Sequence, residues 1–212
     1  MTTTDDWAQT SEQQVLDQAL KLAPAQGWTR RSAIAAGRAA GLSPGETELL
    51  LPHGPADLAA LLSRRHDAAA LQALAAIDPA SLKIRERIAG AVMARSDAAA
   101  GDEPALRRWA GFLALPSNLP LALRLLWESA DKLWRWAGDT ATDENHYSKR
   151  VILSAILAGA LAIRLQSGRE AAQAFVDARI ANVMAYERWK ATLKPTDVLA
   201  EVAGALGRMR FR

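Results

Sequence analysis

Side chains that could take part in catalysis or hold a metal gather in one short stretch of the sequence. They are Asp143, Asn145, His146, Tyr147 and Arg150. A di-iron centre in a helical bundle needs paired Glu-x-x-His motifs on separate helices, whereas this stretch offers a single Asp-x-x-His. Helix capping accounts for the two residues Asp143 and Asn145, and either a solvated salt bridge or a partner contact accounts for Arg150. We therefore predict no catalytic residue and no metal site.

Other signatures of catalysis are missing from the sequence. The chain contains no cysteine, which excludes disulfides, thiolate metal sites and a cysteine nucleophile. It has no Gly-x-Ser-x-Gly elbow, no Walker loop and no Gly-rich dinucleotide fingerprint. His53 and His66 have no carboxylate at the spacing of a Glu-x-x-His motif. The sequence predicts a protein that is not an enzyme and has no catalytic cofactor.

The composition favours helices throughout. Hydrophobic residues make up 50% of the chain, and only 2 Tyr and 3 Phe accompany the 7 Trp, so residues that favour β-strands are scarce. A net charge of +3, from 26 basic and 23 acidic residues, does not demand nucleic acid. No signal peptide is visible. The longest uncharged apolar run, 151–163, is short of the roughly 20 residues that span a bilayer. We expect a cytoplasmic protein that is peripheral on the inner face of the cytoplasmic membrane.

Helical periodicity divides the chain into a small head and a larger body. The head has three short helices with a Gly turn between the second and third, an arrangement typical of helix-turn-helix proteins. The predicted helices span 11–22, 29–41, 43–51, 57–77, 81–95, 104–115, 119–137, 140–166, 169–193 and 197–211, with a loop over 97–103. We expect three units: a head (1–55), a ligand-binding and dimerising body (56–195) and an amphipathic basic C-terminal helix (196–212).

The helix predicted over 119–137 is the most informative element of the body. Its apolar residues recur at alternating spacings of four and three and form one unbroken stripe, and Leu121, Leu125 and Trp136 make a second apolar side. A helix that buries two faces lies centrally in a bundle. As residues that could line a lipid cavity, rather than simply pack the core, we select Leu123, Leu126, Trp127, Ala130, Ile156, Ala160 and Val183.

The head resembles the N-terminal domain of TetR-type regulators over residues 29–62. The landmarks are Thr29, Ile34, Ala35, the turn 40–43, Leu51-Pro52 and Asp57-Leu58. In such a domain the third helix enters the major groove and needs cations for phosphates. Here that helix carries Glu46 and Glu48, although Arg30 and Arg31 could still touch phosphate. We expect no binding to nucleic acid.

The stretch 112–150 resembles the Coq-nine family of ubiquinone biosynthesis, which consists of TetR-like lipid-binding proteins. The resemblance rests on Ala114-Leu115-Pro116, Asn118, Pro120, Trp134, Ala137-Gly138-Asp139, Thr142-Asp143, Asn145, Tyr147 and Lys149-Arg150. The sequence departs from the family pattern at Glu144, which replaces an aromatic residue, and at His146, where an aromatic is also usual. These two departures concern partner contact more than the fold.

The resemblance implies an accessory protein rather than a catalyst. Family members bind isoprenoid or phospholipid tails in the helical body and present quinone precursors to the demethoxyubiquinone hydroxylase. The resemblance places the partner contact at Leu133, Trp134, Asp143, Asn145, Tyr147 and Arg150. It also implies membrane attachment through the C-terminal helix, for which we select Leu199, Val202, Leu206, Arg208 and Arg210.

Two hypotheses of different classes follow. The first is a lipid-binding accessory protein of ubiquinone biosynthesis with an all-α, TetR-like fold, a bound isoprenoid quinone or phospholipid, and a homodimeric assembly. The alternative is a TetR-type transcriptional regulator with a hydrophobic effector. The ligand that copurifies with the protein distinguishes the two.

Overall fold

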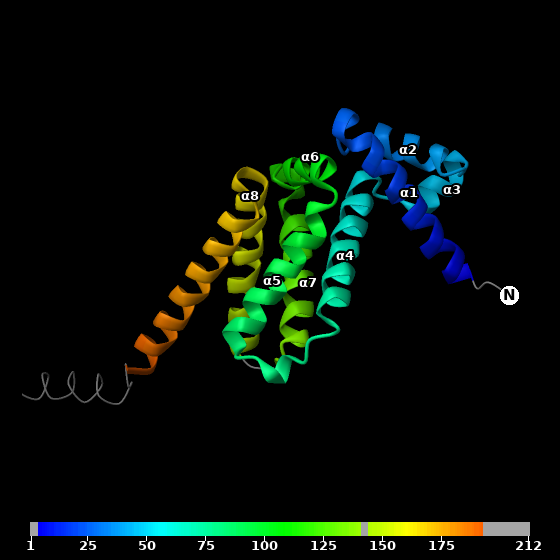
Figure 1. The fold of residues 1–212 in the computed structure, drawn as a ribbon. Coiled ribbons are helices and arrows are strands. Elements are labelled where there is room, and N and C mark those ends of the chain that lie inside the picture. The colour runs from blue at the N-terminus through cyan, green and yellow to red at the C-terminus, as the bar shows by residue number, and fades with distance from the viewer. Residues whose placement is uncertain (1–3, 141–143, 193–212) are drawn as a thin grey trace, which may run out of the picture.

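The computed structural model describes residues 4–140 and 144–192, and within these ranges all regular structure is helical (Figure 1). The α-helices are α1 (Thr4–Gln26), α2 (Arg30–Ala39), α3 (Pro44–Leu50), α4 (Pro55–Leu74), α5 (Ile84–Ala100), α6 (Glu103–Leu113), α7 (Leu119–Trp136) and α8 (Glu144–Thr192). Short 3₁₀ turns cover Pro79–Ser81 and Pro116–Asn118. The predicted all-α, TetR-like bundle is confirmed.

Helices α1, α2 and α3 form the head at one end of the molecule (Figure 1). Two of them begin with a capping box: the side chain of Thr29 accepts from the backbone of Ser32, and that of Ser43 accepts from the backbone of Glu46. Between α2 and α3, Gly41 has φ +85°, a backbone conformation that favours glycine. The head thus has the predicted helix-turn-helix topology.

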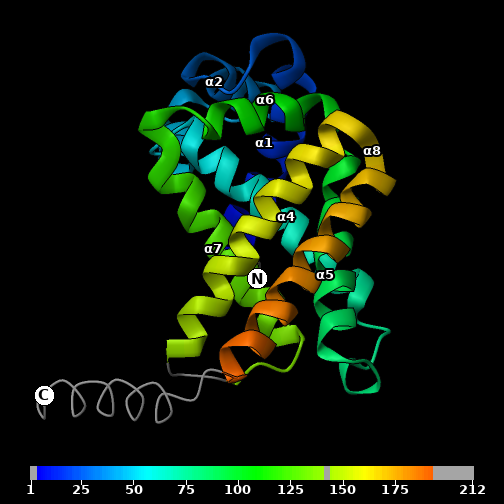
Figure 2. The same cartoon turned by 90° about the vertical axis from the view of Figure 1, so that its left-hand side faces the viewer.

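The body consists of α4 to α8, with α6 lying across the end that faces the head (Figures 1 and 2). One core cluster contains side chains of α1, α2, α4, α6 and the first half of α7. It includes Leu16, Leu62 and Leu106. A second cluster joins α5 to the second half of α7 and to α8, around Leu133 and Leu153. Helix α7 therefore contributes to both cores, as a central helix should.

The predicted helix boundaries differ most from the structure in α1 and α5. Helix α1 begins at Thr4 rather than at residue 11, and it continues through Pro24 to Gln26, ending before Gly27, which has φ +69°. Helix α5 runs to Ala100 through the predicted loop, since alanine favours helix and Ala99 is fully buried.

Helix α8 is two helices that meet at a sharp bend. Gly168 has φ +85° and ψ −174°, which are not helical angles, and it divides Glu144–Thr192 at the break predicted at 167–168. The second half folds back beside α5 and the first half (Figure 2). An 18-residue window within His146–Tyr186 has a mean hydropathy of 1.6, so by length and composition this stretch could cross a membrane, a test that core helices of soluble proteins also pass. The sequence prediction counted only the uncharged run 151–163, which is too short to span a bilayer. The longer stretch passes this test because a membrane-spanning helix tolerates a few charges.

Candidate functional site

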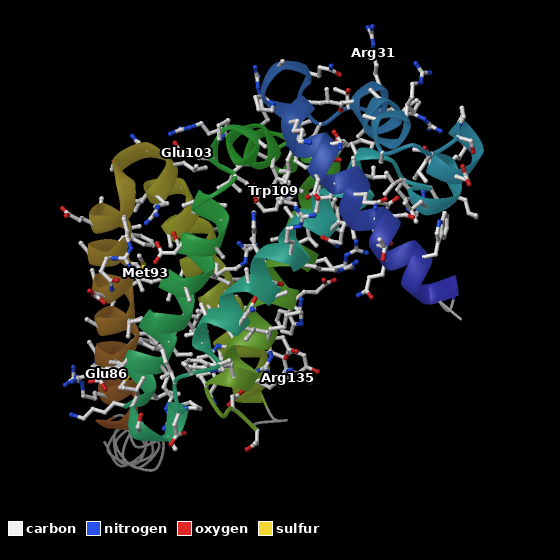
Figure 3. All side chains as sticks on the ribbon, turned by 45° about the vertical axis from the view of Figure 1, so that its right-hand side comes forward. Arg31, Glu86, Met93, Glu103, Trp109 and Arg135 are labelled. Carbon is white, nitrogen blue, oxygen red and sulfur yellow. The ribbon has the colours of Figure 1, made fainter. Side chains whose placement is uncertain are left out.

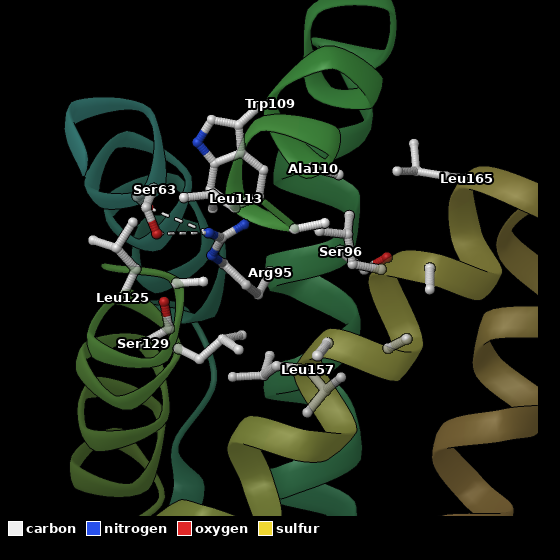
Figure 4. A pocket seen from close by; sticks show the side chains of 18 residues that line it. Ser63, Arg95, Ser96, Trp109, Ala110, Leu113, Leu125, Ser129, Leu157 and Leu165 are labelled. Atoms are coloured by element: carbon white, nitrogen blue, oxygen red, sulfur yellow. Dashed lines mark hydrogen bonds between the residues drawn. The ribbon is translucent and has the colours of Figure 1, made fainter. Parts of the chain in front are cut away.

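A cavity of about 230 Å³, here called the Arg95 cavity, lies inside the body between α4, α5, α6, α7 and α8 (Figure 4). Most of its wall is apolar and includes Leu113, Leu125, Leu126, Leu157, Leu161 and Leu165. Two of the predicted lining residues, Leu126 and Ala160, lie in this wall. The polar residues of the wall are Ser63, Arg95, Ser96 and Ser129. An apolar chamber with a few placed polar groups is the usual form of a small-molecule site.

The guanidinium of Arg95 belongs to a buried network that closes one side of this cavity. Its Nε donates to Asp67 Oδ1 over 2.6 Å, and its Nη2 donates to the carbonyl and hydroxyl oxygens of Ser63. Asp67 also accepts from Ser129 Oγ at 2.7 Å and from Lys132 Nζ at 2.9 Å. Burial lowers the pKa of Arg95 and the nearby Asp67 carboxylate counteracts this, but an arginine in a protein stays protonated.

A second cavity, here called the Trp134 cavity, has a volume of about 520 Å³ and lies between α5, the end of α7 and both halves of α8. Its apolar wall contains the predicted lining residues Ile156 and Val183, together with Ile88 and Ile180. Its polar wall contains Arg85, Arg87, Asp139, Ser148 and Lys149. The predicted lining residues are therefore divided between two cavities.

Three predicted lining residues lie in neither cavity. Leu123 is 58% exposed, Ala130 is packed in the second core, and Trp127 is half-buried against other aromatic rings. The predicted single stripe fails in the first half of α7, where Leu125 is buried and Leu119 is exposed. The physical reason is that the two halves of α7 pack against different cores, so the buried side of the helix changes along its length.

The predicted partner surface contains a group of aromatic rings, next to a buried cluster of ion pairs. Tyr147 is 62% exposed, and its ring lies 6.0 Å from that of Trp127 and 5.2 Å from that of His146. Trp134 is half-buried: its Nε1 donates to the carbonyl of Lys149, and the Lys149 ammonium lies 5.4 Å from its ring centre. Tyr147 is thus available to a partner, and Trp134 links this surface to the Trp134 cavity.

Arg150 and Leu133 do not belong to that exposed surface. Arg150 is 2% exposed and Leu133 is 1% exposed. Arg150 Nε donates to Asp131 Oδ1 at 2.7 Å, and its Nη1 donates to Asp139 Oδ2 at 3.0 Å. The prediction of a solvated salt bridge at Arg150 is wrong, because these buried ion pairs hold the start of α8 against the end of α7. Contact of Arg150 with a partner stays a prediction.

Several remaining predictions fall outside the described residues. They concern Asp143 and the C-terminal positions Leu199, Val202, Leu206, Arg208 and Arg210. Asn145 is described only as part of the α8 backbone. Their roles stay predictions. Within the described ranges, no group of three or more His, Asp or Glu side chains could hold a metal.

The two histidines outside the 143–150 stretch each pair with one carboxylate. His53 Nδ1 lies 3.3 Å from Asp57, and His66 Nε2 lies 2.8 Å from Asp102. Burial, followed by the nearby charge of Arg95, lowers the pKa of His66 to about 4. The His66 imidazole is therefore neutral at neutral pH.

The third helix of the head uses both of its carboxylates internally. The Glu46 side chain accepts from the backbone N–H of Ser43 at 2.8 Å, and this contact with Ser43 lowers the pKa of Glu46. Glu48 pairs with Arg30 at 3.4 Å, while the side chain of Arg31 projects away from the body (Figure 3). Two carboxylates on α3 and the partial neutralisation of Arg30 oppose contact with phosphates.

Comparison with known proteins identifies the part of the chain that forms these cavities. Residues 119–187 match the COQ9 family. Ubiquinone biosynthesis protein COQ9, mitochondrial, of Xenopus tropicalis is 33% identical over 87 residues, which cover 38% of this chain and 27% of the relative. The human protein of the same name is 41% identical over 56 residues, which cover 25% of this chain and 18% of the relative. The similarity thus spans less than a third of either relative.

The names of these relatives correct one prediction. Both are described as mitochondrial. The predicted location, in the cytoplasm on the inner face of the cytoplasmic membrane, is therefore contradicted by the proteins that the chain resembles. That prediction rested on the absence of a visible leader in the sequence, and such an absence does not determine a compartment.

The family match and the fold agree on the same segment. Residues 119–187 run from the start of α7 into the second half of α8, and they contribute wall residues to both cavities and carry the exposed aromatic group. It is through this segment that the chain is similar to the COQ9 family.

Proposed function

We propose that this chain is a lipid-binding accessory protein of ubiquinone biosynthesis that presents a quinone intermediate to the demethoxyubiquinone hydroxylase. One observation carries the proposal: the segment that matches COQ9 also contributes to the walls of two largely apolar cavities and exposes Tyr147. A cavity that holds an apolar tail next to a partner surface suits a protein that passes a poorly soluble substrate to an enzyme.

The geometry of the Trp134 cavity supports the presentation step. Trp134 and Lys149 line this cavity, and Trp134 is also one of the predicted partner residues. Apolar side chains of α5 and α8 form the inner wall, and the basic residues Arg85 and Arg87 lie at the polar side. A lipid with its tail against the apolar wall would have its polar ring near Trp134. The role of this chain is then to hold and orient the substrate, without chemistry of its own.

The first prediction is that an isoprenoid or acyl lipid copurifies with the full chain. Solvent extraction and mass spectrometry of the purified protein measure it. Val183→Trp, which places a large ring in the wall of the Trp134 cavity, should lower the amount of lipid at least threefold. Leu123→Trp, on the exposed side of α7, is the matched control. A lipid-free protein that retards DNA fragments would instead support the transcriptional regulator.

The second prediction concerns the partner surface. Tyr147→Ala should weaken capture of the demethoxyubiquinone hydroxylase more than tenfold in a pull-down, because an exposed tyrosine at the centre of an interface often contributes about 2 kcal/mol. Tyr186→Ala is the control, since Tyr186 is 54% exposed on the second half of α8. Equal capture by the two variants and the wild type would show that the partner binds elsewhere. Membrane attachment and a homodimer stay predictions.

A further inference from the structure

The wall of the Arg95 cavity contains a charged group, which a cavity that binds only a hydrocarbon chain does not require. This wall is largely made of leucine and alanine, yet a guanidinium that is only 8% exposed lies in it. Figure 4 shows Arg95 reaching from α5 below Trp109 toward Ser63, with Leu125 and Ser129 on the same side of the cavity. Burial of a charge is costly unless a partner compensates it, so the partners of Arg95 decide what the cavity accepts.

Arg95 shares its one carboxylate partner with another cation. Asp67 is the carboxylate that contacts Arg95, and the same carboxylate contacts Lys132. Ser129 donates to Asp67 as well, so both oxygens of Asp67 are occupied. Two cations therefore share one anion. Nearby His66 adds no charge because burial lowers its pKa to about 4, and its ring contacts the carboxylate of Asp102 rather than that of Asp67. Asp102 is a second anion, 28% exposed, and it makes no hydrogen bond with Arg95 among the described residues.

One nitrogen of the Arg95 guanidinium is available to a ligand. Its Nε and Nη2 make the hydrogen bonds to Asp67 and Ser63, whereas Nη1 takes part in none of the hydrogen bonds among the described residues. A guanidinium nitrogen that lies beside an apolar chamber suits an anionic oxygen, because a charge-assisted hydrogen bond is stronger than a neutral one and the apolar wall excludes competing water.

We propose that the Arg95 cavity binds a single-chain lipid with a carboxylate head, the head lying at Arg95 Nη1 and the chain lying against the leucines of α6, α7 and α8. The inference rests on the proposed lipid binding and specifies the class of ligand. A volume of about 230 Å³ is below the roughly 300 Å³ at which sites for drug-sized molecules begin, so it suits one chain rather than two. A fatty acid and a benzoate with an alkyl chain share this chemistry.

Calorimetric titration of the full chain at neutral pH, with decanoate, 4-hexylbenzoate and decanol, tests the proposal. Both carboxylates should bind at least tenfold tighter than decanol. The tighter of the two shows whether the cavity prefers a fatty acid or a benzoate with an alkyl chain. Arg95→Met should reduce the difference below threefold while decanol binding persists. Asp67 keeps Lys132 and Ser129 as partners in that variant. Arg64→Met, at an arginine that is 52% exposed on α4 and lies outside the cavity wall, should leave the preference intact.

Lys132→Met provides a second variant if Arg95→Met does not fold. Lys132 is partly exposed and lies outside the cavity wall, and its removal leaves the Asp67–Arg95 pair balanced. We expect the carboxylate preference to fall at least threefold. Equal affinity for decanol and the carboxylates, or an unchanged preference in Lys132→Met, would overturn the head-group assignment while lipid binding still stood. Absence of binding by all three compounds would count against both the assignment and the proposed function.

Discussion

Arg150→Met is expected to lower the free energy of unfolding by about 3 kcal/mol, because it removes one partner from a buried ionic cluster. Arg150 is 2% exposed and contacts both Asp131 and Asp139, and Asp139 is itself buried. Without the arginine, Asp131 keeps Arg135 and Asp139 keeps Lys149, which holds the loss near the lower end of the usual range. Urea denaturation of the purified variant measures the loss.

Arg135→Met is the matched control for that experiment. Arg135 contacts the same Asp131 at 2.7 Å but is 72% exposed, and its side chain lies at the surface in Figure 3. A surface ion pair contributes about 1 kcal/mol or less. Equal losses in Arg135→Met and Arg150→Met would mean that the cluster beneath the partner surface is not a buried support.

The second large effect is a dependence of stability on pH that arises from His66. The unfolded imidazole has a pKa of about 6.5, and in the fold burial and then Arg95 lower this pKa to about 4. Between these values the folded protein holds fewer protons than the unfolded chain, so stability is retained above pH 6.5 and decreases as the pH falls toward 4. The shift corresponds to about 3 kcal/mol over that interval.

His66→Gln should remove that part of the pH dependence, and urea denaturation at several values of pH between 4 and 7 measures it. Carboxylates titrate in the same range, so the informative quantity is the difference between wild type and variant. His53→Gln is the control, because the His53 side chain is 77% exposed and also pairs with a carboxylate. Parallel stability curves for His66→Gln and wild type would contradict a buried neutral imidazole.

Local signals in the sequence predicted most of the helices. The turn at Gly41 and the break at Gly168 lie where the sequence predicted them, and α2 and α3 begin directly after the capping residues Thr29 and Ser43, next to the predicted starts. These features are encoded by a few neighbouring residues, so they could be derived without knowledge of packing. The end of α5 was missed because burial of Ala99 against other helices, rather than a local signal, extends that helix.

The candidate site was harder to predict because it depends on which helices meet. Arg95 follows Ile88, Ala91 and Val92 at helical spacings, which places it on the apolar face of α5 and was a usable signal. Its partner Asp67 lies 28 positions earlier in the chain, on α4. No periodicity within one helix reveals such a pair.

Arg150 shows the same limit in another form. The sequence predicted either an exposed salt bridge or a contact with a partner, because arginine is usually exposed. The structure instead buries it between Asp131 on α7 and Asp139 just after that helix. The family resemblance located the correct region of the chain, but it could not distinguish a residue that supports a surface from one that forms it.

The quinone content of cells that lack this protein tests the central claim most directly. If the chain presents a lipid-tailed intermediate to the hydroxylase, deletion of its gene should lower ubiquinone several-fold and cause demethoxyubiquinone to accumulate. Wild-type protein should reverse both changes. Tyr186→Ala, as the control for Tyr147→Ala, should do so as well, whereas Tyr147→Ala should not. Unchanged levels of both quinones after deletion would contradict a role in ubiquinone biosynthesis.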